Sequence, residues 1–307
     1  MLRRVFLASS PGLERLLERE LQSLRVPGSL EAVPGGVVID GNDESLWRSV
    51  LQSRVAETAR LRLGSAFHAP DVRSLEGRLK QLPWEECLRF DNVKAPGAPA
   101  FEMPQIKVTS DKSRLFHTRL IEERVAEAIE HRQTSQTSAS STASTTAGSA
   151  AEAQSSAERA SDGGSTASSS TVRAPLMMVH AHLRDDQCQV SVNASGLMHQ
   201  RGYRTAVGEA PLRETLAAAC VLASPLLRRL TVAAHAEEEL VLWDPFCGSG
   251  VLLLEALGIV LGQAPGSRAK RYPFERFPSH HGAAYRKVLD SLEPTPHPSL
   301  TRLTLLG

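Results

Sequence analysis

The chain has 307 residues, which is enough for about two domains that each bury a core. Charged residues make up 22% and the formal net charge is +1, so any nucleic-acid binding requires a local basic surface rather than a globally basic protein. No apolar run approaches the ~20 residues of a membrane span, and the four cysteines form no Cys-x-x-Cys pair. This spacing argues against a zinc site or a disulfide framework and favours a reducing compartment.

The first 66 residues alternate between strand and helix patterns. The opening "VFLAS" predicts a strand, although Arg3 and Arg4 just before it faintly suggest a targeting peptide. Leucines recur at helical spacing in "GLERLLERELQSLR", and "DESLWRSVLQSRV" predicts a second helix with Asp43 as its cap. Strands are predicted at "GGVVID" and "ETARLRLGSAF". This β-α-β-α-β order predicts a ferredoxin-like module over residues 1–66.

A cluster of cations lies in the next region. "DVRSLEGRLKQLPWEECL" predicts a helix broken at Pro83, and a strand, a polar turn and a long helix follow in "PQIKVTSDKSRLFHTRLIEERVAEAIEHR". The cations gather around that turn: Lys107, Lys112, Arg114, His117 and Arg119. Cations are disfavoured where the helix dipole is already positive, so the cluster suits a bound anion such as a phosphate. A solvated basic face is the alternative.

Residues 133–172 consist almost entirely of Ser, Thr, Ala and Gly, with almost no aliphatic residues. Such a segment cannot offset the entropy cost of ordering, so we predict a disordered insertion in a loop, or alternatively a linker. "PLMMVHAHLRDDQCQVSVNASG" then predicts a β-hairpin. His180 and His182 share one strand face, but no third metal ligand is near them, so ordinary strand residues are favoured over a metal site.

Residues 197–307 carry an α/β pattern. Leu212, Leu216, Ala219 and Cys220 are helically spaced, and "EEELVLWDPFCGSGVLLLEALGIVL" reads as a buried strand, a glycine turn and an apolar helix. A helix at "GAAYRKVLDSL" and a strand at "SLTRLTLLG" complete the chain.

The glycine turn "DPFCGSG" predicts a ligand site, because ligands bind at the carboxyl ends of strands in α/β sheets. A phosphate loop requires a lysine that this turn lacks, and a dinucleotide fingerprint is weakened by Leu253 at its third glycine position. Asp244 at the strand end suits a ligand with an amino or sulfonium charge, which describes S-adenosylmethionine. A plain tight turn is the alternative.

Two stretches, "RGYRTAVGEAPLRETLAAA" and "DPFCGSGVLLLEA", resemble the THUMP-domain RNA methyltransferases, and most closely the bacterial-type enzymes that methylate N2 of guanine in large-subunit ribosomal RNA. "FLASSPGLERLLEREL" is similar to their ferredoxin-like module, and "KVTSDKSRLFHTRLIEERV" is similar to their RNA-binding THUMP segment. The resemblance implies an α+β N-terminal region, ferredoxin-like (1–66) plus THUMP (67–196). The incomplete start of an α/β Rossmann-like class I methyltransferase domain follows at 197–307.

The resemblance also implies site residues. S-adenosylmethionine would be lined by Asp244, Phe246, Cys247, Gly248, Ser249 and Gly250. Thr215 would be the contact from the preceding helix, with Glu214 beside it; in the alternative, Glu214 and Arg213 are exposed neighbours on a solvated face. RNA would be bound by the cluster of cations between Lys107 and Arg119.

The sequence departs from this family in two places. No acidic residue follows the strand at "LTRLTLLG", and no Asn-Pro-Pro-aromatic or Asp-Pro-Pro-aromatic loop occurs. That loop positions the target amine, and methyl transfer depends on in-line placement. We therefore expect a truncated chain that is inactive alone, has unknown catalytic residues and exposes apolar surface on its short sheet.

The first hypothesis is thus an RNA guanine-N2 methyltransferase acting on ribosomal RNA, with transfer RNA as a variant substrate. The second is a non-catalytic THUMP protein that only binds RNA. Both predict an RNA partner, no metal and no membrane, in a soluble intracellular protein, with the cytoplasm favoured over the nucleus or an organelle. The oligomeric state is not predicted.

Overall fold

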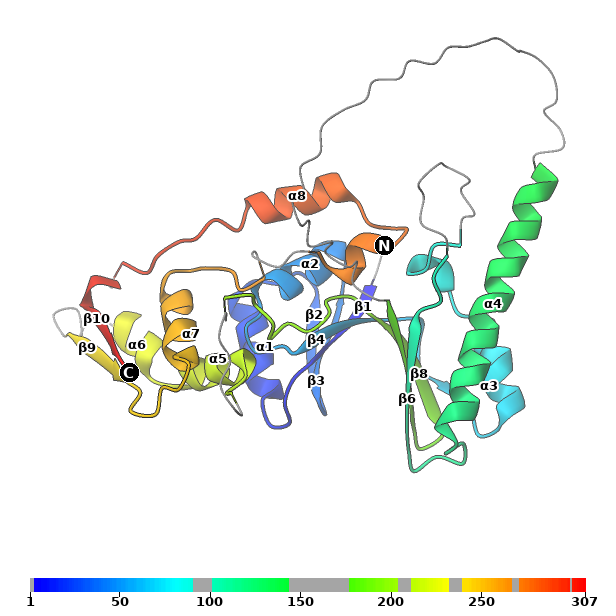
Figure 1. The fold of residues 1–307 in the computed structure, drawn as a ribbon, viewed down its shortest axis with the longest axis horizontal. Helices are drawn as coiled ribbons and strands as arrows, with labels where there is room; N and C mark the ends of the chain where they lie inside the picture. Colours follow the sequence, from blue (N-terminus) through cyan, green and yellow to red (C-terminus); the bar gives the residue numbers. More distant parts are fainter. Residues whose placement is uncertain are drawn as a thin grey trace, which may run out of the picture.

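The computed structural model describes residues 3–90, 101–143, 177–203, 211–231, 239–266, 271–298 and 300–307, without the side chains of 136–143 and 231. An eight-stranded sheet with helices forms one part of the molecule, and a two-stranded sheet with its own helices forms the other (Figure 1). The strands are β1 Arg3–Ala8, β2 Ser29–Val33, β3 Gly36–Gly41, β4 Thr58–Arg62, β5 Phe67–His68, β6 Gln105–Asp111, β7 Met178–Arg184, β8 Gln187–Asn193, β9 Leu240–Trp243 and β10 Leu303–Leu306. The α-helices are α1 Glu14–Ser23, α2 Asp43–Gln52, α3 Val72–Leu79, α4 Thr118–Ala143, α5 Glu214–Ala223, α6 Leu226–Thr231, α7 Val251–Val260 and α8 Gly282–Asp290.

The N-terminal module is ferredoxin-like, as predicted, but it has one more strand than the sequence indicated. Its order is β1-α1-β2-β3-α2-β4, and the strands lie antiparallel in the order β2-β3-β1-β4. The unpredicted strand β2 lies at the edge of the sheet, and none of its residues is fully buried. Its sequence "SLEAV" alternates polar and apolar residues and Leu30 packs against the core, but the run is short and contains Glu and Ala, which are depleted in strands.

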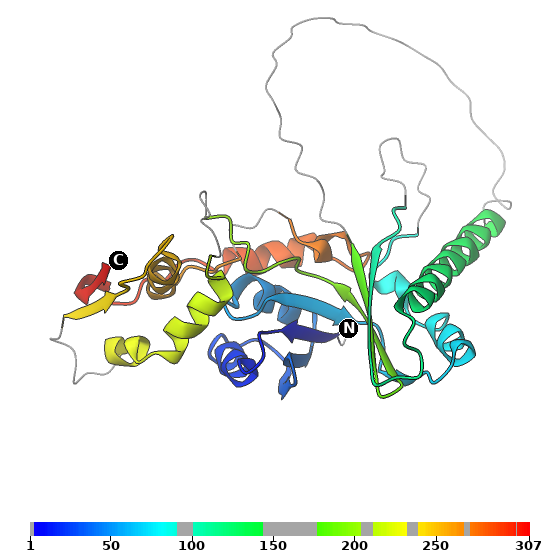
Figure 2. The same cartoon turned by 60° about the horizontal axis from the view of Figure 1, so that its bottom comes forward.

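The sheet does not stop at residue 66. Strand β4 pairs with β8, and the sheet continues through β7 to β6, with α3 and α4 packed on one face (Figures 1 and 2). The predicted hairpin is present, and Asp185 and Asp186 at its turn have φ of 50° and 59°, as two-residue hairpin turns require. Helix α4 continues to Ala143, so the prediction of disorder is wrong for 133–143. Residues 144–172 of the predicted insert lie outside the described residues.

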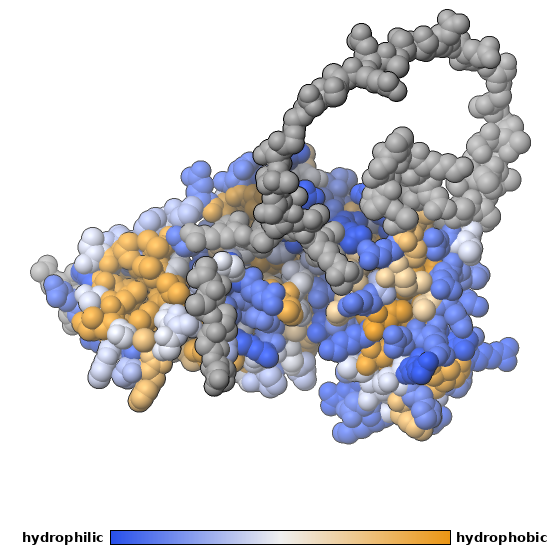
Figure 3. All heavy atoms as spheres, in the orientation of Figure 1, coloured by the Kyte–Doolittle hydropathy of each residue, from blue (hydrophilic) through white to orange (hydrophobic). Residues whose placement is uncertain are grey.

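The second part is built on two parallel strands. Strand β10 pairs in register with β9, which confirms the predicted strand at "LTRLTLLG". Helices α5, α6 and α7 bury Leu240 and the small cluster around Ala256 and Val260 against one face. On the other face the side chains of Val241 and Trp243 are 61% and 67% exposed. Figure 3 accordingly shows hydrophobic residues gathered at this end of the molecule.

The chain after α7 returns to the N-terminal module. The α8 segment packs against α2, where Trp47 makes an edge-to-face contact with Tyr285 at 5.6 Å between ring centroids. Phe274, just before α8, is fully buried in the same aromatic cluster. The buried Arg3 bonds Asp43 and Glu86 and also donates to Ser279 in the segment before α8, so in the structure this arginine is a core ion-pair partner. No helix within the described ranges is both long enough and apolar enough to cross a membrane.

Candidate cofactor site

The predicted glycine turn lies at the carboxyl ends of both strands of the small sheet. Strand β9 ends at Trp243, and the turn 244–250 leads directly into α7. The backbone N–H of Asp244 donates to the carbonyl of Leu306 at 2.8 Å, and the Asp244 carboxylate accepts from the N–H of Phe246 at 3.2 Å. The N–H of Gly250 donates to the carbonyl of Cys247 at 2.7 Å. The turn is therefore held by its own backbone, by the Asp244 carboxylate and by the end of β10, at the strand edge where α/β sheets bind ligands.

The two glycines are necessary for this turn. Gly248 and Gly250 have φ of 52° and 70°, a conformation that residues with a Cβ rarely adopt. A Cβ placed on Gly250 would meet nothing within 4 Å, so its backbone faces open space. Gly250 also precedes the first residue of α7, where free backbone N–H groups favour a negatively charged ligand group.

The other turn residues form an accessible rim. Phe246 is 93% exposed, Ser249 is exposed, and Asp244 and Cys247 are half-buried. The structure thus brings the six predicted turn residues together, with an acid and an aromatic ring beside an open backbone.

Thr215 and Glu214 lie in the first turn of α5, which packs along α7. They are 1% and 6% exposed, so the alternative that Glu214 lies on a solvated face is wrong. Arg213 is the exposed residue of that stretch, and it pairs with Glu57 at 3.5 Å. Within the part of the chain that the structure describes, the buried Thr215 hydroxyl has no hydrogen-bond partner. A buried hydroxyl without a partner is unfavourable and is available to a ligand.

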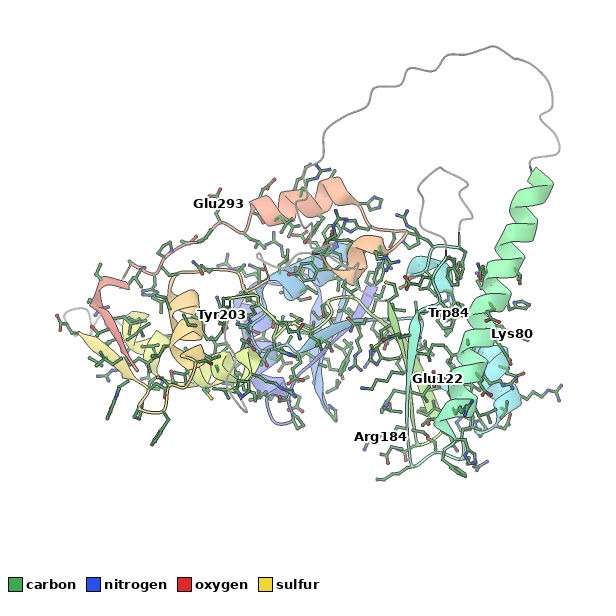
Figure 4. All side chains as sticks on the ribbon, in the orientation of Figure 1. Lys80, Trp84, Glu122, Arg184, Tyr203 and Glu293 are labelled. Atoms are coloured by element: carbon green, nitrogen blue, oxygen red, sulfur yellow. The ribbon has the colours of Figure 1, made fainter. Side chains whose placement is uncertain are left out.

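Sequence reasoning missed the buried acid of α7. Glu255 is completely buried and accepts from Arg54 at 2.7 Å and from Tyr203 at 2.6 Å, and also from Arg201. Figure 4 labels Tyr203 between α7 and the N-terminal module. Burial lowers the pKa of Arg54, and burial together with the Glu255 carboxylate raises the pKa of Tyr203.

The ion cluster around Glu255 links α7, the helix after the glycine turn, to the ferredoxin-like module. Arg54 comes from the loop between α2 and β4, and a Cβ on Gly258 of α7 would lie only 3.0 Å from its guanidinium. Further along, the N–H of Gly266 donates to the carbonyl of Leu51 at 2.8 Å. One feature of the sequence could have revealed this cluster: Glu255 is the single charged residue in "VLLLEALGIV", and an acid within so apolar a helix requires a buried partner.

The predicted RNA-binding cations are brought together only in part. Lys107 lies on β6, whereas Lys112 and Arg114 lie in the loop before α4, where the rings of His117 and Phe116 are in tilted contact at 4.1 Å between centroids. Arg119 is the second residue of the helix.

Acidic side chains accompany the cations near α4. Arg114 pairs with Asp186 at 3.4 Å, and Arg119 pairs with Glu123 at 3.5 Å. A hollow of about 830 Å³ between β6 and α4 is lined by both Lys107 and Arg119, but also by Glu122 and Glu123. Figure 4 labels Glu122 on α4. The helix entrance is therefore of mixed charge rather than uniformly basic.

The two histidines of β7 differ in their surroundings. His180 is buried, and the exposed His182 bonds the Thr109 hydroxyl through Nδ1 at 2.7 Å. Within the described ranges, no three His, Cys, Asp or Glu side chains are grouped so that they could hold a metal ion.

Solved structures share the fold of this chain. The chain is similar to a protein from Listeria monocytogenes described as a predicted N6-adenine-specific DNA methylase, with 22% identity and a TM-score of 0.68 over 95% of this chain and 64% of that one. It is also similar to SMU.472 complexed with SAH, with 23% identity and a TM-score of 0.66 over the same shares. These likenesses show the fold, a ferredoxin-like domain followed by the mixed α/β fold of class I methyltransferases.

Family models narrow the class further. Residues 4–58 match the RlmL ferredoxin-like domain, and residues 201–290 match the RMKL-like methyltransferase domain, UPF0020. These two matches confirm the resemblance to RlmL/RlmKL-like methyltransferases that was seen in the sequence.

Curated relatives extend over nearly all of this chain. The ribosomal RNA large subunit methyltransferase K/L of Saccharophagus degradans is 28% identical over 295 residues, which are 93% of this chain and 32% of the relative. That of Methylococcus capsulatus is 28% identical over 302 residues, 98% of this chain and 35% of the relative. The Synechocystis protein slr0064, provisionally named an RNA methyltransferase, is 28% identical over 291 residues, 93% of this chain and 62% of its own length. The chain thus spans between about a third and just under two thirds of these relatives.

Proposed function

We propose that this chain supplies the RNA-binding part and the cofactor-binding turn of an S-adenosylmethionine-dependent RNA methyltransferase, acting on N2 of a guanine in large-subunit ribosomal RNA. The observation that carries the proposal is the open glycine turn between β9 and α7, joined through Glu255 to a ferredoxin-like module. The names of the K/L relatives support ribosomal RNA as the substrate. We propose residues 67–196 as the RNA-binding THUMP domain.

The residues of the turn fit S-adenosylmethionine. The open backbone at the start of α7 suits the ligand's carboxylate, and the half-buried Asp244 suits its positive charge. The unpartnered Thr215 hydroxyl is a further hydrogen-bonding group on the adjacent helix. When bound, the cofactor supplies an activated methyl group. The chain's own contribution is to bind the cofactor and to fix its orientation relative to the RNA.

We also propose that the 307-residue chain on its own binds the cofactor but does not transfer the methyl group. Its sequence has no Asn-Pro-Pro or Asp-Pro-Pro segment to position the target amine. The uncovered face of β9, on which Trp243 is exposed, supports a cofactor pocket that is open on one side.

Calorimetry with S-adenosylhomocysteine tests the cofactor site. Asp244→Asn should weaken binding by tenfold or more, because it removes the only acid of the turn. The matched control Asp290→Asn, on the exposed end of α8, should leave binding unchanged. Absence of binding by the unmodified chain would contradict the cofactor proposal.

A transfer assay with radiolabelled cofactor and fragments of ribosomal or transfer RNA tests the reaction and separates the two substrates. Methyl transfer by the isolated chain would show that it is complete as a catalyst.

The exposed face of β9 and the missing loop favour a second candidate, a protein that binds RNA without catalysis. It predicts RNA binding that weakens with salt, together with no binding of S-adenosylhomocysteine. Tight cofactor binding would eliminate it.

A further inference from the structure

One face of the large sheet carries polar and cationic side chains instead of a helix layer. In β7, Val179, Ala181 and Leu183 are buried toward α3 and α4, so the alternate residues point to the opposite face. Figure 4 shows Arg184 on the side of the sheet away from those helices. We call this surface the open face, formed by alternate residues of β4, β8, β7 and β6.

The open face contains a register row that crosses four strands. Arg62 pairs with Ser191, Ser191 with His180, and His180 with Lys107. At a strand spacing of ~4.8 Å, the row spans about 14 Å. It places two cations and two hydrogen-bonding side chains along one line.

Positive charge on the open face is compensated mainly at its margins, where Asp40 of β3 and Glu31 of β2 interact with Arg62. Its cations are Arg60, Arg62, Lys107 and Arg184, whereas the only acid at the open-face positions of these four strands is Asp111. Asp111 lies at the end of β6, 3.9 Å from Arg184. Among the residues that the structure describes, no carboxylate interacts with Arg60 at the centre of the face, unlike the α4 entrance with Glu122 and Glu123.

Two buried groups at this centre have no partner. Within the described residues, the Nε of Arg60 and the Nε2 of His180 are both buried and make no hydrogen bond. Burial, together with the charges of Arg60 and Lys107, lowers the pKa of His180 to about 4. Unpartnered buried donors are unfavourable, and an anionic acceptor would satisfy them.

An aromatic ring adjoins the cations. Phe6 of β1 pairs across the sheet with Arg60, and the guanidinium of Arg62 lies over its ring at 5.2 Å from the centroid. Surfaces that bind single-stranded nucleic acid combine such a ring, on which a base stacks, with cations that follow the phosphates.

We propose that the open face binds the sugar–phosphate backbone of the RNA, with Arg60, Arg62 and Lys107 contacting phosphates and Phe6 offering a stacking surface. This inference rests on the proposed function, because it takes RNA as the substrate class. It shifts the main contact from the loop and helix start at 112–119 to the sheet itself.

The test measures binding of a fluorescein-labelled 16-nucleotide single-stranded RNA to the full chain by fluorescence anisotropy over a range of salt. The variant Arg62→Gln/Lys107→Gln should bind at least tenfold more weakly. Its salt slope should fall by about 1.4, because each of the two phosphates that it no longer neutralises contributes ~0.7. The matched control Arg73→Gln/Arg78→Gln removes the same charge from the exposed side of α3 and should bind within twofold of the parent. Circular dichroism and melting temperature establish that each variant folds.

The outcomes separate the two proposals. Failure of the unmodified chain to bind any RNA overturns the proposed function, and this inference with it. If RNA binding weakens equally in the sheet variant and in the α3 control, only the assignment of RNA binding to the open face is overturned. A loss confined to Lys112→Gln/Arg114→Gln likewise overturns it and assigns the contact to the loop before α4.

Discussion

Replacing Glu255 with glutamine should destabilise the protein more than a change of one atom suggests. Its carboxylate is completely buried and neutralises the guanidiniums of Arg54 and Arg201, which are themselves buried. The glutamine amide fits the same space but leaves both cations without this counter-charge and turns N–H donors toward other donors. Breaking a buried ion pair on one side costs about 3–5 kcal/mol.

The lower end of that range applies here. Glu20 is also buried nearby, where burial raises its pKa and hydrogen bonds from Ser53 and Arg54 oppose that rise; its interaction with Arg54 supplements that of Glu255. We therefore expect a loss of about 3 kcal/mol, which at about 2–4 °C per kcal/mol lowers the melting temperature by about 6–12 °C.

Urea denaturation followed by circular dichroism measures this loss. Glu293→Gln provides the control, because Glu293 is exposed beyond α8 and its substitution should change the unfolding free energy by less than about 0.5 kcal/mol (Figure 4). The reasoning is refuted if Glu255→Gln unfolds at the same urea concentration as this control.

Three further predictions concern the sheet and the turn. His180 has a folded-state pKa near 4 against 6.5 when unfolded, so the unfolded state gains a proton first as pH falls. The free energy of unfolding should therefore decrease by about 3 kcal/mol as pH drops from 6.5 through 4. His180→Gln should lack this decrease in denaturation measured across that pH range, and an equal decrease in the two proteins would contradict the reasoning. Gly250→Ala should reduce the unfolding free energy by about 1–2 kcal/mol in thermal denaturation, because Gly250 has a left-handed φ, and should weaken S-adenosylhomocysteine binding. Gly77→Ala within α3, where a Cβ would meet nothing within 4 Å, should instead stabilise the protein by up to about 1 kcal/mol. Val241→Thr/Trp243→Ser should reduce concentration-dependent self-association in sedimentation velocity, since both side chains lie on the exposed apolar face; unchanged sedimentation would argue against that face as the cause.

Local patterns identified most of the elements because their signals are contained within a few residues. The period of the leucines predicted α1, the alternation of "VHAHL" predicted β7, and the glycines of "DPFCGSG" predicted a turn that two left-handed φ angles confirm. Strand β2 was missed because its five residues are too few for a clear pattern and include Glu and Ala, which are depleted in strands.

Helix α5 marks the limit of such patterns. The spacing of Leu212 and Cys220 indicated its apolar face, yet both are exposed, and Leu212 precedes the helix. The buried residues are instead Thr215 and the alanines, because close packing against α7 selects small side chains over large apolar ones.

By itself the sequence indicated most of the elements in their order, the glycine turn and the resemblance to RNA methyltransferases. Only the tertiary structure decided which distant charges meet: Arg54 with Glu255 across 201 positions of chain, and Arg62 with Lys107 in one row across β8 and β7. Such partners are set by strand order and helix docking, which depend on packing over the whole chain. No local periodicity encodes them, so the buried ion cluster and the open cationic face became visible only in the folded molecule.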